Sequence, residues 1–123
     1  MPQLDRRKSP RYYCRLSALL ENKEVPVYLY DLCLDGCFVE TLKEDLIPKG
    51  EKVNLVIFVP CVGPIEVKGI VRHHGTPERV GMGIEFVEFS EHLQLVYALF
   101  VKKVLPLLQE ARMLYQKLVK EEE

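Results

Sequence analysis

Two short runs near the start of the chain contain the residues best suited to binding a ligand. Residues 6–11 read Arg-Arg-Lys-Ser-Pro-Arg, and residues 31–36 read Asp-Leu-Cys-Leu-Asp-Gly. An arginine guanidinium donates two parallel hydrogen bonds to a phosphate, or to O6 and N7 of guanine, and its flat face stacks on a purine. An aspartate can accept hydrogen bonds from the N1–H and N2–H groups of one guanine. Together the two runs could hold a phosphate and read a guanine.

Each run also has a simpler interpretation when it is taken alone. The arginine cluster is then a solvated basic terminus, which Pro2 and Pro10 keep out of a helix. Asp31 and Asp35 beside Gly36 are the residue types of an ordinary turn. The order of the runs, and the fold between and after them, must decide between these interpretations.

Composition and charge are those of an ordinary globular domain. The 123 residues are 48% hydrophobic and 28% charged, with a formal net charge of −1, which fits one domain with its own core. Residues 1–15 differ, since five cationic side chains and one acidic side chain give them a net charge of +4. Such local basic charge favours a small anionic ligand over nucleic acid. The N-terminus does not resemble a signal peptide and no apolar run reaches the roughly 18 residues of a membrane span, which predicts a cytoplasmic protein without membrane insertion.

No arrangement of residues predicts catalysis or a metal site. The four cysteines lack the CxxC spacing of a zinc or redox site. His73 and His74 would point to opposite faces of a strand, so they cannot easily share one ion. By strand position, His73 or Arg72 would line the rim of a ligand site. No nucleophile is paired with a base at an interpretable spacing, so we expect no catalytic residue, no metal and no cofactor.

Alternating apolar and polar residues predict six short strands. We place them at residues 12–20, 25–32, 37–40, 53–59, 65–73 and 80–87. Glycine and proline separate several of them, and no helical pattern lies between them. This arrangement indicates an antiparallel barrel or sandwich rather than a parallel sheet. A hairpin of the first two strands would bring residue 31 beneath an arm that ends at Arg11.

The C-terminal segment has the pattern of a helix, with Ser90 as the expected N-cap. Pro106 predicts a kink or two consecutive helices, since proline costs about 3 kcal/mol in a helix interior. We expect the part up to Val104 to pack on the barrel mouth and the part beyond Pro106 to project. The projecting part needs a partner, and we expect self-association, most simply a dimer. Apolar residues recur at alternating steps of four and three, at Leu93, Tyr97, Phe100, Val104, Leu107, Ala111, Leu114 and Leu118.

Taken in order, these features resemble the PilZ domain family. Residues 7–11 match its RxxxR motif, with Arg6 giving the doubled arginine that is common there. Residues 31–36 match its (D/N)xSxxG motif except at Cys33. Residues 69–72 and 81–86 are similar to the last two strands of that domain, so the resemblance covers residues 5–100.

The resemblance implies a six-stranded antiparallel β-barrel of the split-barrel type. A flexible ligand-binding arm would span residues 1–11, the barrel 12–89 and the helical segment 90–123. It also implies the ligand cyclic di-GMP, a bacterial second messenger that such proteins typically bind as an intercalated pair. By the family pattern, the ligand-binding residues are Arg6, Arg7, Arg11, Asp31, Cys33 and Gly36.

The family pattern also implies a role for each of these residues. The arm arginines would clasp phosphates and guanine faces, Asp31 would read a guanine edge, and Gly36 would leave room for the ligand. Cys33 stands where the family has serine, and a thiol is only a weak hydrogen-bond donor or acceptor. Because a lost neutral hydrogen bond costs about 0.5–1.5 kcal/mol, we expect affinity to fall roughly two- to twelve-fold rather than vanish.

The function that we expect is a cyclic di-GMP receptor and adaptor. The ligand would gather the arm onto the barrel and so change a surface that a target protein recognises. We see no output domain, so the effector would be an unidentified protein controlling motility, adhesion, exopolysaccharide or transcription. One alternative is a degenerate PilZ module that binds protein without the nucleotide. Another is a barrel for single-stranded nucleic acid, although no basic groove with spaced aromatic residues can be found.

Overall fold

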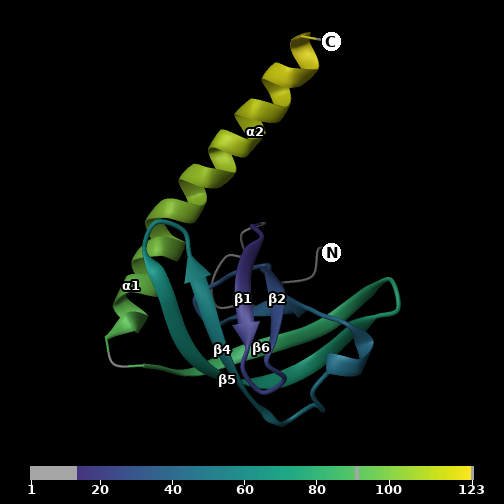
Figure 1. Ribbon diagram of the computed structural model, residues 1–123. Helices are drawn as coiled ribbons and strands as arrows, with labels where there is room; N and C mark the ends of the chain where they lie inside the picture. The colour runs from purple at the N-terminus through teal and green to yellow at the C-terminus, as the bar shows by residue number, and fades with distance from the viewer. Residues whose placement is uncertain (1–13, 91, 123) are drawn as a thin grey trace, which may run out of the picture.

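The computed structural model describes residues 14–90 and 92–122. Six antiparallel strands form a closed barrel in the order β1-β2-β3-β6-β5-β4, which confirms the predicted six-stranded barrel and excludes the sandwich (Figure 1). A short 3₁₀ turn, η1 (Lys43–Asp45), connects β3 and β4. The strands are β1 (Leu16–Leu20), β2 (Val25–Tyr30), β3 (Gly36–Glu40), β4 (Lys52–Val59), β5 (Gly63–Thr76) and β6 (Arg79–Phe89).

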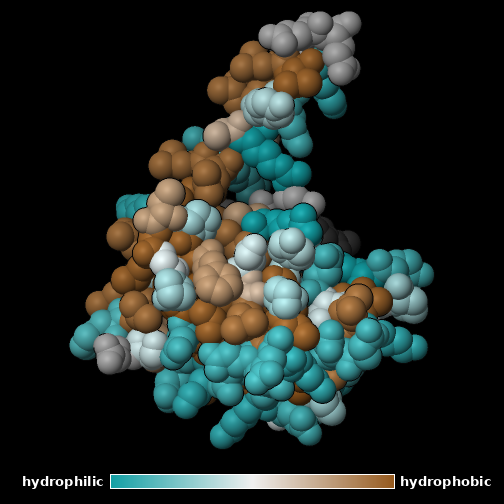
Figure 2. All heavy atoms as spheres, in the orientation of Figure 1, coloured by the Kyte–Doolittle hydropathy of each residue, from teal (hydrophilic) through white to brown (hydrophobic). Residues whose placement is uncertain are grey.

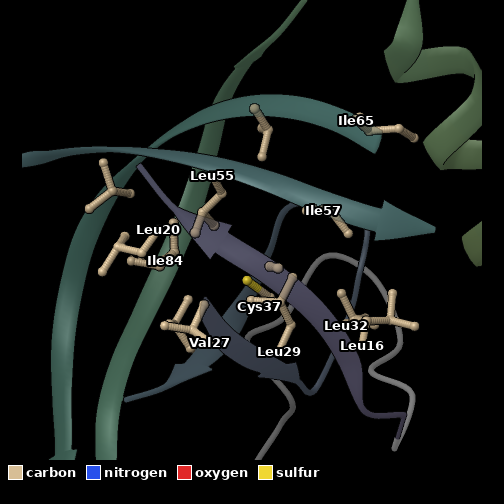
Figure 3. Packing of buried hydrophobic residues seen from close by; sticks show 14 of the residues in the cluster. Leu16, Leu20, Val27, Leu29, Leu32, Cys37, Leu55, Ile57, Ile65 and Ile84 are labelled. Carbon is tan, nitrogen blue, oxygen red and sulfur yellow. The ribbon is translucent and has the colours of Figure 1, made fainter. Parts of the chain in front are cut away.

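Alternating burial along the strands builds a core inside the barrel. In β1, Leu16 and Ala18 are buried, and they pair with the buried Leu29 and Val27 of β2. Figure 3 shows such side chains from several strands pointing into the same interior. Each fully buried leucine or valine contributes about 1.5–3 kcal/mol relative to an exposed one. The loops at the barrel edge therefore stand on a packed scaffold.

Strands β5 and β6 are longer than the sequence predicts, at 14 and 11 residues. The prediction left out residues 74–79 because this exposed segment has no apolar alternation. The pairing nevertheless continues as far as Thr76 opposite Arg79, with three register shifts on the way. The tip of this hairpin extends past the barrel wall (Figure 1), and Arg79 lies over the Phe38 ring of β3.

The C-terminal segment begins with α1 (Leu93–Leu99), whose N-cap is His92. The prediction of Ser90 as the N-cap is wrong. The Ser90 N–H still donates to the Glu66 carbonyl of β5, and the Ser90 carbonyl accepts from Leu93 in the turn that precedes the helix. Ser90 therefore belongs to the exit from β6.

A π-helical turn, η2 (Phe100–Val104), joins α1 to α2 (Leu105–Glu122), and α2 projects from the barrel (Figure 1). The Leu105 N–H donates to Phe100, five residues back, and Pro106 follows as the second residue of α2. A wide turn before Pro106 confirms the predicted break. One predicted contact is wrong at this turn. The sequence predicted that Val104 packs on the barrel, but Val104 is 38% exposed and Leu105 is buried in its place. No helix among the described residues is long and apolar enough to cross a membrane.

Candidate functional site

A groove of about 710 Å³ opens where the loop after β2 meets β3, β5 and β6. Its walls carry both charged and aromatic side chains. Three of the predicted binding residues, Asp31, Cys33 and Gly36, line it, and Arg72 and His73 stand at its wall as strand position suggested. The lining is completed by Asp35, Cys37, Phe38, His74, Gly75, Thr76, Arg79, Gly83, Ile84, Glu85 and Phe86.

The loop from residue 31 to residue 36 is a tight turn held by its neighbours. Asp31 adopts a left-handed backbone with φ of 52°, a conformation that aspartate tolerates better than most residues. The Cys33 N–H donates to the Gly36 carbonyl at 3.0 Å, and the Cys33 thiol lies 3.4 Å from the same oxygen. Two later elements also bind the loop. The Phe86 N–H of β6 donates to the Asp35 backbone carbonyl at 2.7 Å, and the Tyr97 hydroxyl of α1 donates to the Cys33 backbone carbonyl at 2.7 Å. Helix α1 and strand β6 therefore fix the loop.

Cys33 has a role in this turn that the family motif does not show. The residue is 9% exposed, and its thiol bonds within the turn, where a serine hydroxyl could make the same contact. Gly36 likewise has a packing reason to be glycine, because a Cβ there would lie 2.1 Å from the Ile84 carbonyl oxygen of β6. Both residues shape the loop that presents Asp31 to the groove.

Asp31 pairs with a cation that the sequence did not reveal. The Arg79 guanidinium donates to the Asp31 carboxylate at 3.1 Å. It also lies 4.2 Å from the ring centroid of Phe38 and 5.8 Å from that of Tyr30, within the range of cation–π attraction. Arg79 follows directly on the β5–β6 turn, so only the extended hairpin brings it to residue 31. The groove therefore contains a carboxylate, a guanidinium and an aromatic face in contact.

Arg72, Glu85 and His74 of the groove are bound to each other or to the backbone, and His73 packs against a neighbouring strand. Arg72 Nε donates to the Glu85 carboxylate at 3.0 Å across β5 and β6. The His74 Nε2 atom lies 2.7 Å from the Ile47 carbonyl oxygen. The His73 ring packs over Gly83, where a Cβ would lie 2.0 Å from a ring atom. This wall is set in place before any ligand arrives.

The buried hydroxyl and thiol beside the loop stay protonated. Burial raises the pKa of Tyr97 well above its ordinary value, with further increases from Cys37, Cys33 and Asp35. Burial likewise raises the pKa of Cys37, helped by Cys33 and Asp31. Neither group is a nucleophile at neutral pH. Among the described residues, no three histidine, cysteine or acidic side chains are placed to hold a metal ion.

The arm residues Arg6, Arg7 and Arg11 lie outside the described residues. The structure does show where the chain enters the barrel. The β1–β2 register pairs Leu16 with Leu29, and two further residues in that register would set Cys14 opposite Asp31. Cys14 also lines a depression with Tyr30, the residue before Asp31, so the chain enters β1 next to the loop that lines the groove.

A family model for the PilZ domain matches residues 5–101. The chain belongs to the PilZ domain family. This match spans the arginine run, the loop that carries Asp31 and the whole barrel, so the resemblance found in the sequence is confirmed. PilZ domains are binding modules rather than enzymes.

The solved structures include a neighbour of this PilZ domain with the same fold. It is the Bacillus subtilis Inhibitor of motility (MotI/DgrA), with a TM-score of 0.70 and 20% sequence identity over 81% of this chain and 51% of that chain. The chain thus spans about half the length of that neighbour, and the likeness establishes the shared barrel. A comparison with curated proteins found no match.

Proposed function

We propose that this PilZ domain is a receptor for cyclic di-GMP, which binds in the groove beside the loop of residues 31–36. The observation that carries the proposal is the contact of Asp31, Arg79 and Phe38 in one groove beside the start of β1. These groups supply an acceptor for a guanine edge, a cation for a phosphate and a face for stacking. PilZ membership supports the choice of ligand.

In this proposal Asp31 reads the guanine edge. Its carboxylate already binds the Arg79 guanidinium, a planar group whose N–H donors resemble the N1–H and N2–H edge of guanine. Guanine would replace this guanidinium at Asp31. Arg79 would then remain over Phe38 and turn to a phosphate, as a guanidinium can do through bidentate hydrogen bonds.

The arm arginines would close the site from the other side. Arg11 lies three residues before Cys14, so its Cα can be at most about 11 Å away along an extended chain. Because Cys14 follows the register toward Asp31, the Arg11 side chain can reach the groove, and Arg7 and Arg6 can extend further over a bound dinucleotide. Cys33 would supply the weaker polar contact.

Ligand binding would change the surface around the groove, and a partner protein would recognise that change. We place the protein in the cytoplasm, as an adaptor whose effector controls motility, adhesion, exopolysaccharide or transcription. The solved neighbour is titled an inhibitor of motility, so motility is the first process to test. Self-association through α2 is part of this proposal.

The second candidate is a degenerate PilZ module that binds protein without the nucleotide. Two observations favour it: Cys33 replaces the motif serine, and Arg79 already satisfies Asp31. It predicts that Asp31 matters only for folding, whereas the receptor proposal predicts that Asp31 matters for the ligand.

Isothermal titration with cyclic di-GMP distinguishes the two candidates. Wild-type protein is expected to bind, and Asp31→Asn is expected to weaken binding roughly tenfold or more, because a charge-assisted hydrogen bond is lost. Asparagine tolerates the left-handed backbone, so the loop should persist. Asp45→Asn in η1 is the matched control and should bind like wild type, while Arg7→Ala tests the arm. Absence of heat at high micromolar wild-type protein would refute the receptor proposal.

A further inference from the structure

The projecting helix α2 exposes an apolar face that nothing else in the described chain covers. Between Leu107 and Val119, seven large apolar side chains are 38–68% exposed. Figure 2 shows hydrophobic side chains along this helix from its base toward its tip. Exposed apolar faces of this kind mark protein contacts.

The seam of α2, defined as Leu107, Ala111, Leu114 and Leu118, points away from the barrel. Leu105, Gln109 and Arg112 lie on the opposite side, where they line a depression with Cys14 and Tyr30 of the barrel; Leu108, between this side and the seam, lines the same depression. With about 100° of rotation per residue, the seam is centred roughly 160° around the helix from the centre of Leu105, Gln109 and Arg112. A second protein can therefore approach the seam without touching the barrel.

We propose that the seam packs antiparallel against the seam of a second copy of this chain. In the register that fits best, Leu107 lies opposite Leu118 of the second copy, and Ala111 lies opposite Leu114. Two-fold symmetry repeats each pair. The two central layers, each formed by Ala111 of one copy and Leu114 of the other, then combine a small side chain with a large one. Leu105 of one copy lies level with Lys120 of the other, so the two helices overlap along nearly all of α2.

The residues that flank the seam fit the same register. Glu110 and Lys117 lie on one side of the seam, at the positions that meet each other in an antiparallel pair of helices. Glu110 thus faces Lys117 of the second copy, twice by symmetry. On the other flank, Leu108 faces Tyr115 twice. Both flanks are therefore complementary in one register.

A parallel dimer fits the sequence less well. It would set Ala111 against Ala111 and leave a gap in the middle of the seam. It would also place Glu110 opposite Tyr115, where the carboxylate has no cation. In the antiparallel dimer, moreover, the two barrels lie at opposite ends of the helix pair and on opposite sides of it, so they do not collide.

Sedimentation equilibrium on the full chain tests the dimer and its register. Wild type is expected at twice the chain mass at tens of micromolar, and Leu114→Asp at the monomer mass. Circular dichroism verifies that the barrel of Leu114→Asp is intact, as expected for a side chain that is 56% exposed on the helix face turned away from the barrel. A wild-type monomer at high micromolar concentration would overturn the proposal.

Charge reversal tests the antiparallel arrangement itself. Glu110→Lys and Lys117→Glu each place like charges together twice, so each is expected to weaken the dimer roughly three- to tenfold. The double variant restores opposite charges and is expected to regain the wild-type dissociation constant. Lys120→Glu, on the barrel-facing side of α2, is the matched control and should change nothing. A dimer that the single reversals leave unchanged, or that the double variant fails to restore, would overturn the register. The dimer rests on the self-association in the proposed function; because cyclic di-GMP is absent from this experiment, failure of the dimer and failure of ligand binding are distinguished.

Discussion

Tyr97→Phe is expected to loosen the loop that carries Asp31 while leaving the core around it in place. The Tyr97 hydroxyl is buried and donates a 2.7 Å hydrogen bond to the Cys33 carbonyl. Phenylalanine would keep the ring contacts with Phe86 and Phe89, whose centroids lie 5.5 Å and 5.2 Å away. The carbonyl would lose this donor, and an unsatisfied buried group costs about 1–3 kcal/mol. We therefore expect the free energy of unfolding to fall by about 1.5 kcal/mol.

Urea unfolding followed by circular dichroism measures this difference. Tyr28→Phe is the matched control, because Tyr28 is 42% exposed on β2 and its ring contact with Arg15 would be kept. The control should lie within about 0.5 kcal/mol of wild type, as most surface substitutions do. Cyclic di-GMP affinity should fall in Tyr97→Phe as well, since ligand binding would then have to order the loop. Equal stability of the two variants would refute the reasoning that α1 holds the loop.

Three further predictions concern the loop and the core beneath it. Gly36→Ala would bring a Cβ within 2.1 Å of the Ile84 carbonyl oxygen, so urea unfolding should show a loss of about 2–3 kcal/mol. Gly50→Ala is the control. A Cβ at residue 50 would meet no neighbour within 4 Å, and only the positive φ of 88° would strain it, so this variant should lose less stability. Cys33→Ser should raise cyclic di-GMP affinity roughly two- to twelve-fold in titration calorimetry, with no gain refuting a ligand contact at this residue. Burial raises the pKa of Cys37 above its ordinary 9.0, so the folded state keeps this proton more tightly. The contribution of this bound proton to the free energy of unfolding is complete below pH 9.0 and is lost as pH rises above it. The free energy of unfolding, measured from pH 7 to pH 10, should therefore decline, and it should decline less in Cys37→Ala.

The barrel could be predicted from the sequence because alternation and burial agree along most strands. Leu16, Ala18 and Leu20 alternate in the sequence and face the interior in the structure. Pro106 predicted a break in the helix, since a missing N–H is a local property that tertiary context rarely overrides. Local rules were sufficient where the determining chemistry lies within a few residues.

Features that depend on partners distant in sequence could not be predicted in this way. Arg79 reaches Asp31 across 48 residues, and only the unpatterned tip of the β5–β6 hairpin puts it there. The packing reason for Gly36 depends on how closely β6 approaches β3. Leu105 replaces Val104 in the core because the π-helical turn shifts the helix face, and Pro106 predicts that the helix breaks but not which face the wider turn buries.

An NMR titration of 15N-labelled protein with cyclic di-GMP tests the central claim most directly, because it reports both whether the ligand binds and where. Saturable shift changes are expected for the amides of residues 31–36 and for Arg79 and its neighbours, together with the arm residues 6–11. The outer turns of α2 should stay unchanged and serve as an internal control. An unchanged spectrum at saturating ligand, or changes that avoid the groove, would contradict the proposal that this PilZ domain receives cyclic di-GMP at Asp31.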